Sequence, residues 1–98
     1  MICALGAILI VLLLIDWRQT LTISDHPEKW SEMNPILGKH PTRGRVHSHF
    51  ALGLLVTSCA VLFAFNYPVW NAYVMLGLGA VIALELFCTI NNYRIGIK

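Results

Sequence analysis

Two acidic residues that stand inside apolar stretches, Asp16 and Glu85, are the first candidates for chemistry in this 98-residue chain. A charged side chain at the centre of a bilayer costs about 2.5–3.5 kcal/mol on insertion scales, so it usually faces the protein interior and is paired. Helical spacing gives each carboxylate polar neighbours on its own face: Gln19 and Thr20 beside Asp16, Thr89 and Asn92 beside Glu85. Both polar stripes are expected near the same membrane surface, where they can face each other in a bundle.

The two carboxylates have three interpretations. The first is a cation or proton site that opens to the cytoplasm. The second is structural, with a carboxylate paired to Arg94, or to Arg43 or Arg45 from the loop. The third is a contact with another subunit. We favour the structural interpretation, because a charge near the interface costs less than one at mid-membrane.

Histidines form the second set of candidate residues: His26, His40, His47 and His49, accompanied by Glu28 and Glu32. Imidazole and carboxylate groups are common metal ligands. The rings of a His-x-His pair share a face only in an extended segment, and they diverge on a helix. Because a helix is expected to begin at this pair, we predict no bound metal and no other cofactor.

Other catalytic or binding motifs are weak. Ser48 stands between two histidines, but adjacent residues do not by themselves form a nucleophile and base, and no oxyanion-forming turn is indicated. The chain has no phosphate-binding glycine pattern and no basic, aromatic surface for nucleic acid. Cys3, Cys59 and Cys88 all lie within apolar runs and are expected to be buried, reduced thiols.

The segments that must position these residues are typical of a membrane protein. Hydrophobic residues make up 57% of the chain and charged residues 12%, about half the charged fraction of a soluble domain. We predict an all-α fold of one domain, with transmembrane helices over about 2–23, 46–67 and 69–90. Residues 2–15 alone would rise about 21 Å, too short for a hydrocarbon core of about 30 Å, so the first helix must continue through Asp16.

The polar residues 24–45 are predicted to be a cytoplasmic loop that carries a short interfacial helix. Asp25 is expected to cap this helix, Trp30 and Met33 to share its membrane-facing side, and Asn34-Pro35 to end it.

Basic residues predict the orientation. All seven lie in or beside the loop or in the C-terminal tail: Arg18, Lys29, Lys39, Arg43, Arg45, Arg94 and Lys98. Short loops rich in Lys and Arg stay in the cytoplasm, so we predict the N-terminus outside and the C-terminus inside a bacterial inner membrane. Tyr67, Trp70 and Tyr73 would then form the outer aromatic belt.

Small residues predict where helices approach closely, because association in lipid depends on packing. Ala60 and Ala64 are four apart on the second helix, and Gly79 and Ala83 are four apart on the third. These pairs suit contact with each other or with a partner chain.

A resemblance covers most of the chain. It rests on the strings Asp16-Trp17-Arg18-Gln19-Thr20 and Glu32-Met33-Asn34-Pro35-Ile36-Leu37-Gly38-Lys39-His40-Pro41, and on the tail Asn92-Tyr93-Arg94-Ile95-Gly96. The chain resembles small bacterial and phage integral membrane proteins of unknown function with a D-W-x-Q-T … E-x-N-P-x-L-G-x-H-P pattern. The resemblance implies that the motif residues form one arrangement, with the loop folded under the bundle. With the acidic stripes they define a candidate polar cluster at the cytoplasmic membrane face: Asp16, Gln19, Thr20, Glu32, Asn34, His40, Glu85 and Arg94.

Three functions fit this sequence. The first, which we favour, is a non-catalytic accessory or scaffolding subunit of a larger membrane assembly, with the bilayer and partner helices, or further copies of itself, as its contacts. The second is a holin-like pore-former of a phage lysis system, with Thr57 and Ser58 lining a lesion. The third is a small membrane enzyme or ion-binding protein that uses Asp16, Glu32, Glu85 and loop histidines.

Overall fold

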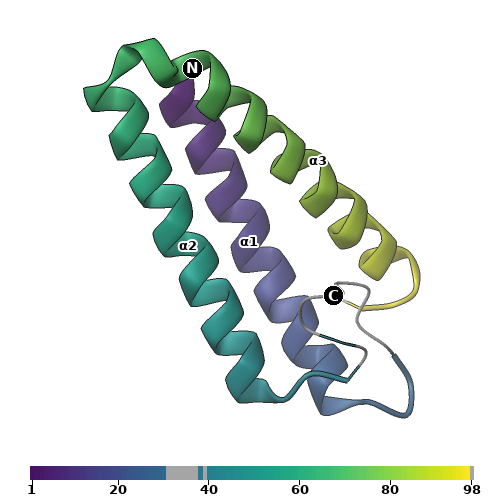
Figure 1. Cartoon of the computed structure of the whole chain (residues 1–98). Coiled ribbons are helices and arrows are strands. Elements are labelled where there is room, and N and C mark those ends of the chain that lie inside the picture. The colour runs from purple at the N-terminus through teal and green to yellow at the C-terminus, as the bar shows by residue number, and fades with distance from the viewer. Residues whose placement is uncertain (31–37, 39, 98) are drawn as a thin grey trace.

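The computed structural model describes residues 1–30, 38 and 40–97, and this part of the chain is helical with no β-strand. Its elements are α1 (Ile2–Asp25), α2 (Arg43–Asn66), the short 3-10 helix η1 (Pro68–Trp70) and α3 (Asn71–Arg94). The three long helices run side by side in an elongated bundle (Figure 1). Within the described residues, each is long and apolar enough to cross a membrane. The predicted all-α chain with three such helices is confirmed.

The helix ends differ from the predicted ones by a few residues. α1 continues to Asp25, and α2 begins at Arg43. The early start of α2 has a local cause, because the Thr42 hydroxyl accepts a hydrogen bond from the Arg45 backbone N–H at 3.2 Å. A side-chain oxygen in this position satisfies one of the free N–H groups of the first turn.

The C-terminus of α3 is closed by a glycine turn. Gly96 has a φ of 102°, a left-handed conformation that glycine adopts without steric cost. The turn lets the Ile97 N–H donate to the Asn92 carbonyl oxygen at 2.9 Å, and it buries the Ile97 side chain completely. α3 therefore extends to Arg94, beyond the predicted end.

The expected interfacial helix is described only in part. Asp25, its expected cap, is instead the last residue of α1. Residues 27–29 form a turn, in which the Trp30 N–H donates to the His26 carbonyl oxygen at 3.1 Å. Met33 and Asn34-Pro35 lie outside the described residues, so the interfacial helix stays a prediction.

α1 is the central helix of the bundle. In the most apolar stretch of each helix, 39% of the residues of α1 are buried inside the protein, against 17% for α2 and 11% for η1 and α3 together. α1 packs against both other helices, whereas α2 and α3 lie apart over much of their length (Figure 1). The buried apolar core joins all three helices through Ile2, Leu9, Leu13, Val46, Phe50, Ala64 and Leu78.

Small residues divide between this core and the surface. A Cβ atom on Gly6 would lie 2.6 Å from Cγ2 of Val61, so Gly6 is where α1 and α2 approach closely. Ala64 is fully buried, but Gly79 and Ala83 are exposed. A Cβ atom added to Gly79 meets nothing within 4 Å, so the α3 pair does not pack against α2 within this chain.

Candidate functional site

A buried polar cluster joins α1 to α3 at the end of the bundle that carries the loop. Gln19 lies at its centre: its amide Nε2 donates to the Thr89 carbonyl oxygen at 3.3 Å, and its Oε1 accepts from Nδ2 of Asn92 at 3.2 Å. All three residues are buried. Side-chain hydrogen bonds across membrane helices contribute about 0.6 kcal/mol on average. The cluster therefore fixes α3 against α1.

Asp16 extends this polar surface along α1. Its carboxylate oxygen Oδ1 accepts a hydrogen bond from the Thr20 hydroxyl at 3.1 Å, one helical turn away. Asp16 is 6% exposed and Thr20 is fully buried. The carboxylate is thus buried and bonded within its own helix.

A second set of contacts holds α1 to α2. The indole Nε1 of Trp17 donates to Nδ1 of His47 at 3.1 Å, and the Trp17 ring stacks on Phe50 with centroids 6.0 Å apart. At the helix ends, the Arg43 guanidinium contacts both carboxylate oxygens of Asp25 at 2.7 and 2.8 Å. These contacts bring together the two ends of the 26–42 connection.

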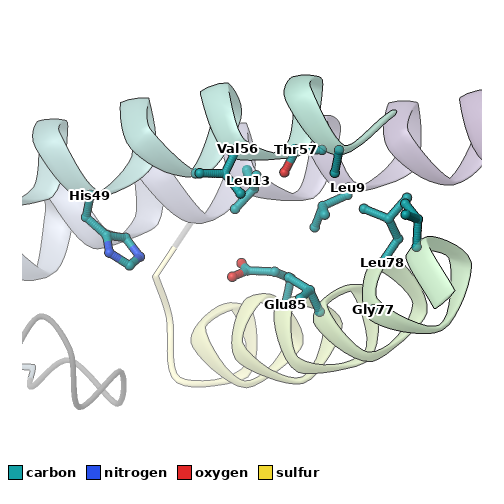
Figure 2. A pocket seen from close by; sticks show the side chains of 12 residues that line it. Leu9, Leu13, His49, Val56, Thr57, Gly77, Leu78 and Glu85 are labelled. Carbon is teal, nitrogen blue, oxygen red and sulfur yellow. The ribbon is translucent and has the colours of Figure 1, made fainter. Parts of the chain in front are cut away.

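A cavity of about 470 Å³ opens between α2 and α3, with α1 as its floor. Three of the residues that line it have polar side chains: His49, Thr57 and Glu85. The others are apolar or small: Leu9, Leu13, Gly53, Val56, Ala60, Val74, Gly77, Leu78 and Val81. Figure 2 shows the Glu85 carboxylate and the His49 ring directed toward each other across one end of this space. The Oε2 atom of Glu85 is shielded from solvent.

Glu85 and His49 lie at comparable depth because α2 and α3 run in opposite directions. His49 is about 9 Å along the helix axis from Arg43, and Glu85 is about 14 Å from Arg94. Both side chains therefore stand one to three turns inside the helix ends. A carboxylate and an imidazole at this position can accept hydrogen bonds, bind a cation or exchange a proton.

The predicted polar cluster is divided between these places. Asp16, Gln19 and Thr20 lie in the buried α1–α3 surface, together with Thr89 and Asn92 from the Glu85 stripe. Glu85 itself faces the cavity. Arg94 is exposed in the last turn of α3, and His40 is exposed before α2. Glu32 and Asn34 lie outside the described residues.

The histidines do not gather. His47 contacts Trp17, His49 lines the cavity, and the His26 ring bonds to the Thr22 carbonyl oxygen at 3.1 Å. In the described part of the chain, no three His, Cys, Asp or Glu side chains are grouped as metal ligands. His47 and His49 diverge because α2 already begins at Arg43.

Sequence patterns group His49 with the neighbouring histidines and Glu85 with Asp16, so they do not pair His49 with Glu85. Counting residues from the loop end of α2 and from the C-terminal end of α3, two antiparallel helices, places them at a similar depth, since both stand a few turns inside.

Comparison with protein-family models, with curated proteins and with solved structures finds no match for this chain. The resemblance in the loop and tail motifs stays a prediction.

Proposed function

We propose that this chain is a non-catalytic subunit of a larger assembly in a bacterial inner membrane. The observation that carries this proposal is the face of α3 that points away from the cavity, called its outer face below. There the small residues Gly79 and Ala83 are exposed one helical turn apart. They lie on the side of α3 away from the cavity-lining residues Gly77 and Val81, since a helix turns about 100° per residue.

Small residues at this spacing are typical of helix–helix interfaces, where they let two backbones approach. The described helices leave this face exposed, and a Cβ atom added at Gly79 meets no atom of the described residues within 4 Å. A partner helix packed on Gly79 and Ala83 would cover it. α1 packs against both α2 and α3, and these contacts hold α3 in place with its Gly79–Ala83 face exposed.

The proposed orientation has the N-terminus outside and the loop and C-terminus in the cytoplasm. Arg43, Arg45 and Arg94 all lie at one end of the bundle, whereas the α2–α3 turn at the other end carries Tyr67 and Trp70. Along the chain, Trp70 and Tyr93 are about 34 Å apart in helical rise, which suits two interfaces around a core of about 30 Å. A green fluorescent protein fused after Lys98 should fluoresce in intact cells, and a periplasmic alkaline phosphatase fused there should be inactive.

Stoichiometric purification tests the subunit proposal. The tagged chain, expressed at native level and extracted in mild detergent, should carry other chains in a fixed ratio. Ala83→Leu should release them, because the larger side chain blocks close approach on α3. Ala51→Leu, an equal change at an exposed position of α2, should retain them.

Recovery of the chain alone in large homo-oligomers would contradict this proposal and favour the pore-former. The structure gives that alternative less support, because Thr57 is buried and the Ser58 hydroxyl bonds to the Leu54 carbonyl oxygen of its own helix at 2.9 Å.

A further inference from the structure

We propose that the cavity between α2 and α3 is a binding site for a long-chain primary amine, with the alkyl chain along the apolar walls and the ammonium group at Glu85. This inference does not depend on the partner proposed above, because the cavity and the Gly79–Ala83 face lie on different sides of α3.

The shape of the cavity suits one alkyl chain. Its lining runs from His49 to Ala60 on α2 and from Val74 to Glu85 on α3, about 16 Å of helix on each side. Its volume of about 470 Å³ falls within the range of about 300–1,000 Å³ that holds one small ligand. Such a space is too small for both acyl chains of a phospholipid, which favours a single-chain molecule.

The charge at one end selects the head group. Among the described residues that line the cavity, Glu85 is acidic and none is Lys or Arg. An ammonium group has three N–H donors, and the buried Oε2 atom of the Glu85 carboxylate can accept from one of them. Figure 2 shows the Glu85 and His49 side chains at the same end of the cavity, where the ammonium group would lie beside the Glu85 carboxylate.

The depth of Glu85 makes the pairing favourable. An ammonium–carboxylate contact away from bulk water is stronger than one at the surface, and charge-assisted hydrogen bonds are about twice as strong as neutral ones. An amine with an alkyl chain partitions into the bilayer, so it reaches this depth with its chain already in lipid. A short-chain amine of the same charge would lack this route.

Two glycines of α3 offer a matched pair of variants. Gly77 lines the cavity and Gly79 does not. A Cβ atom at either position meets nothing within 4 Å among the described residues, so the first carbon of a side chain fits at both sites. Gly77→Leu should fill the cavity, while Gly79→Leu adds the same volume to the outer face.

The test uses the purified full-length chain in phosphatidylcholine nanodiscs, with tritium-labelled dodecylamine in a scintillation proximity assay. The wild-type chain and Gly79→Leu should bind one amine per chain, saturably. Gly77→Leu should lose saturable binding. Glu85→Gln should bind at least about tenfold more weakly, because it removes one charge-assisted contact. Unlabelled dodecylamine should displace the label, and dodecanol, which has the same chain without the charge, should not.

Three results would overturn the proposal: no saturable binding to the wild-type chain, equal binding to Gly77→Leu, or equal displacement by dodecanol. The dodecanol comparison uses the wild-type chain alone, so it decides the role of charge even where Glu85→Gln fails to fold. Loss of partner chains in Ala83→Leu has no bearing on this assay, so the two proposals fail separately.

Discussion

The two carboxylates of the membrane-spanning helices have different surroundings. Asp16 lies on the central helix, where the Thr20 hydroxyl bonds to it and packed helices bury it. Glu85 lies on the least buried helix and faces a cavity of about 470 Å³ opposite His49. The carboxylate of Asp16 is thus buried between packed helices, whereas the carboxylate of Glu85 lines a cavity.

This difference follows from helix packing more than from residue type. α1 contacts both neighbours and its polar residues Asp16, Gln19 and Thr20 are buried, whereas α2 and α3 have few contacts with each other and leave a cavity between them. A polar residue in a membrane bundle is therefore a stronger candidate for ligand binding where helices separate than where they meet.

The largest difference in the free energy of unfolding is expected when a leucine side chain is added at Gly6, on the central helix, and at Gly77, beside the cavity. Gly6→Leu should lower the free energy of unfolding by about 3 kcal/mol or more, because a Cβ atom there already overlaps Val61. Gly77→Leu, on the open side, should change it by less than about 1 kcal/mol, since nothing stands within 4 Å. Unfolding by sodium dodecyl sulfate in mixed micelles measures both. Equal destabilisation would show that the cavity is not open.

A smaller loss of folding stability is expected from a substitution in the buried polar cluster between α1 and α3. Gln19→Leu removes the bonds to Thr89 and Asn92 and leaves a buried amide without its acceptor, which should cost about 1–3 kcal/mol. Asn66→Leu is the control, because that amide bonds to a carbonyl of its own helix at the exposed end. A double-mutant cycle of Gln19→Leu with Asn92→Leu should give a coupling energy, and additive losses would contradict a joint cluster.

Glu85→Gln should alter stability less than this, by under about 1 kcal/mol, because glutamine keeps the size and hydrogen-bonding capacity of the side chain. The comparison with Gln19→Leu in the same unfolding assay is informative. A loss as large as that of Gln19→Leu would place Glu85 among the structural residues together with Asp16.

The smallest effect should follow Arg43→Ala. The Arg43–Asp25 pair joins side chains that are about half exposed, and such pairs contribute roughly 0–1 kcal/mol. The loss should shrink further in high salt, because exposed charges are screened. A salt-independent loss above this range would show that the pair has a larger role in closing the loop than its exposure indicates.

Much of the fold was predictable from hydrophobic runs and their lengths. The length needed to span a bilayer correctly predicts that the first helix continues through Asp16, beyond its apolar stretch. The helix ends were less predictable, because they depend on local contacts: the Thr42 cap moves the start of α2, and the Gly96 turn extends α3.

The site was less predictable than the fold. Helical spacing groups Gln19 and Thr20 with Asp16, and Thr89 and Asn92 with Glu85. In the structure Thr89 and Asn92 contact Gln19 while Glu85 lines the cavity, because spacing on one helix does not reveal which neighbour each side chain meets. The tight contact at Gly6 and the cavity beside Glu85 both depend on how far helices separate. That separation is set by the whole set of packed side chains.

The most direct test of the subunit proposal is cross-linking from the outer face of α3 in native membranes. Cys3, Cys59 and Cys88 are first replaced by serine, and Ala83→Cys is labelled with a benzophenone maleimide, with Ala51→Cys as the control. We predict one adduct from position 83, with a different chain and a single mass, and none from position 51. Adducts with lipid alone, or only with further copies of this chain, would contradict the account.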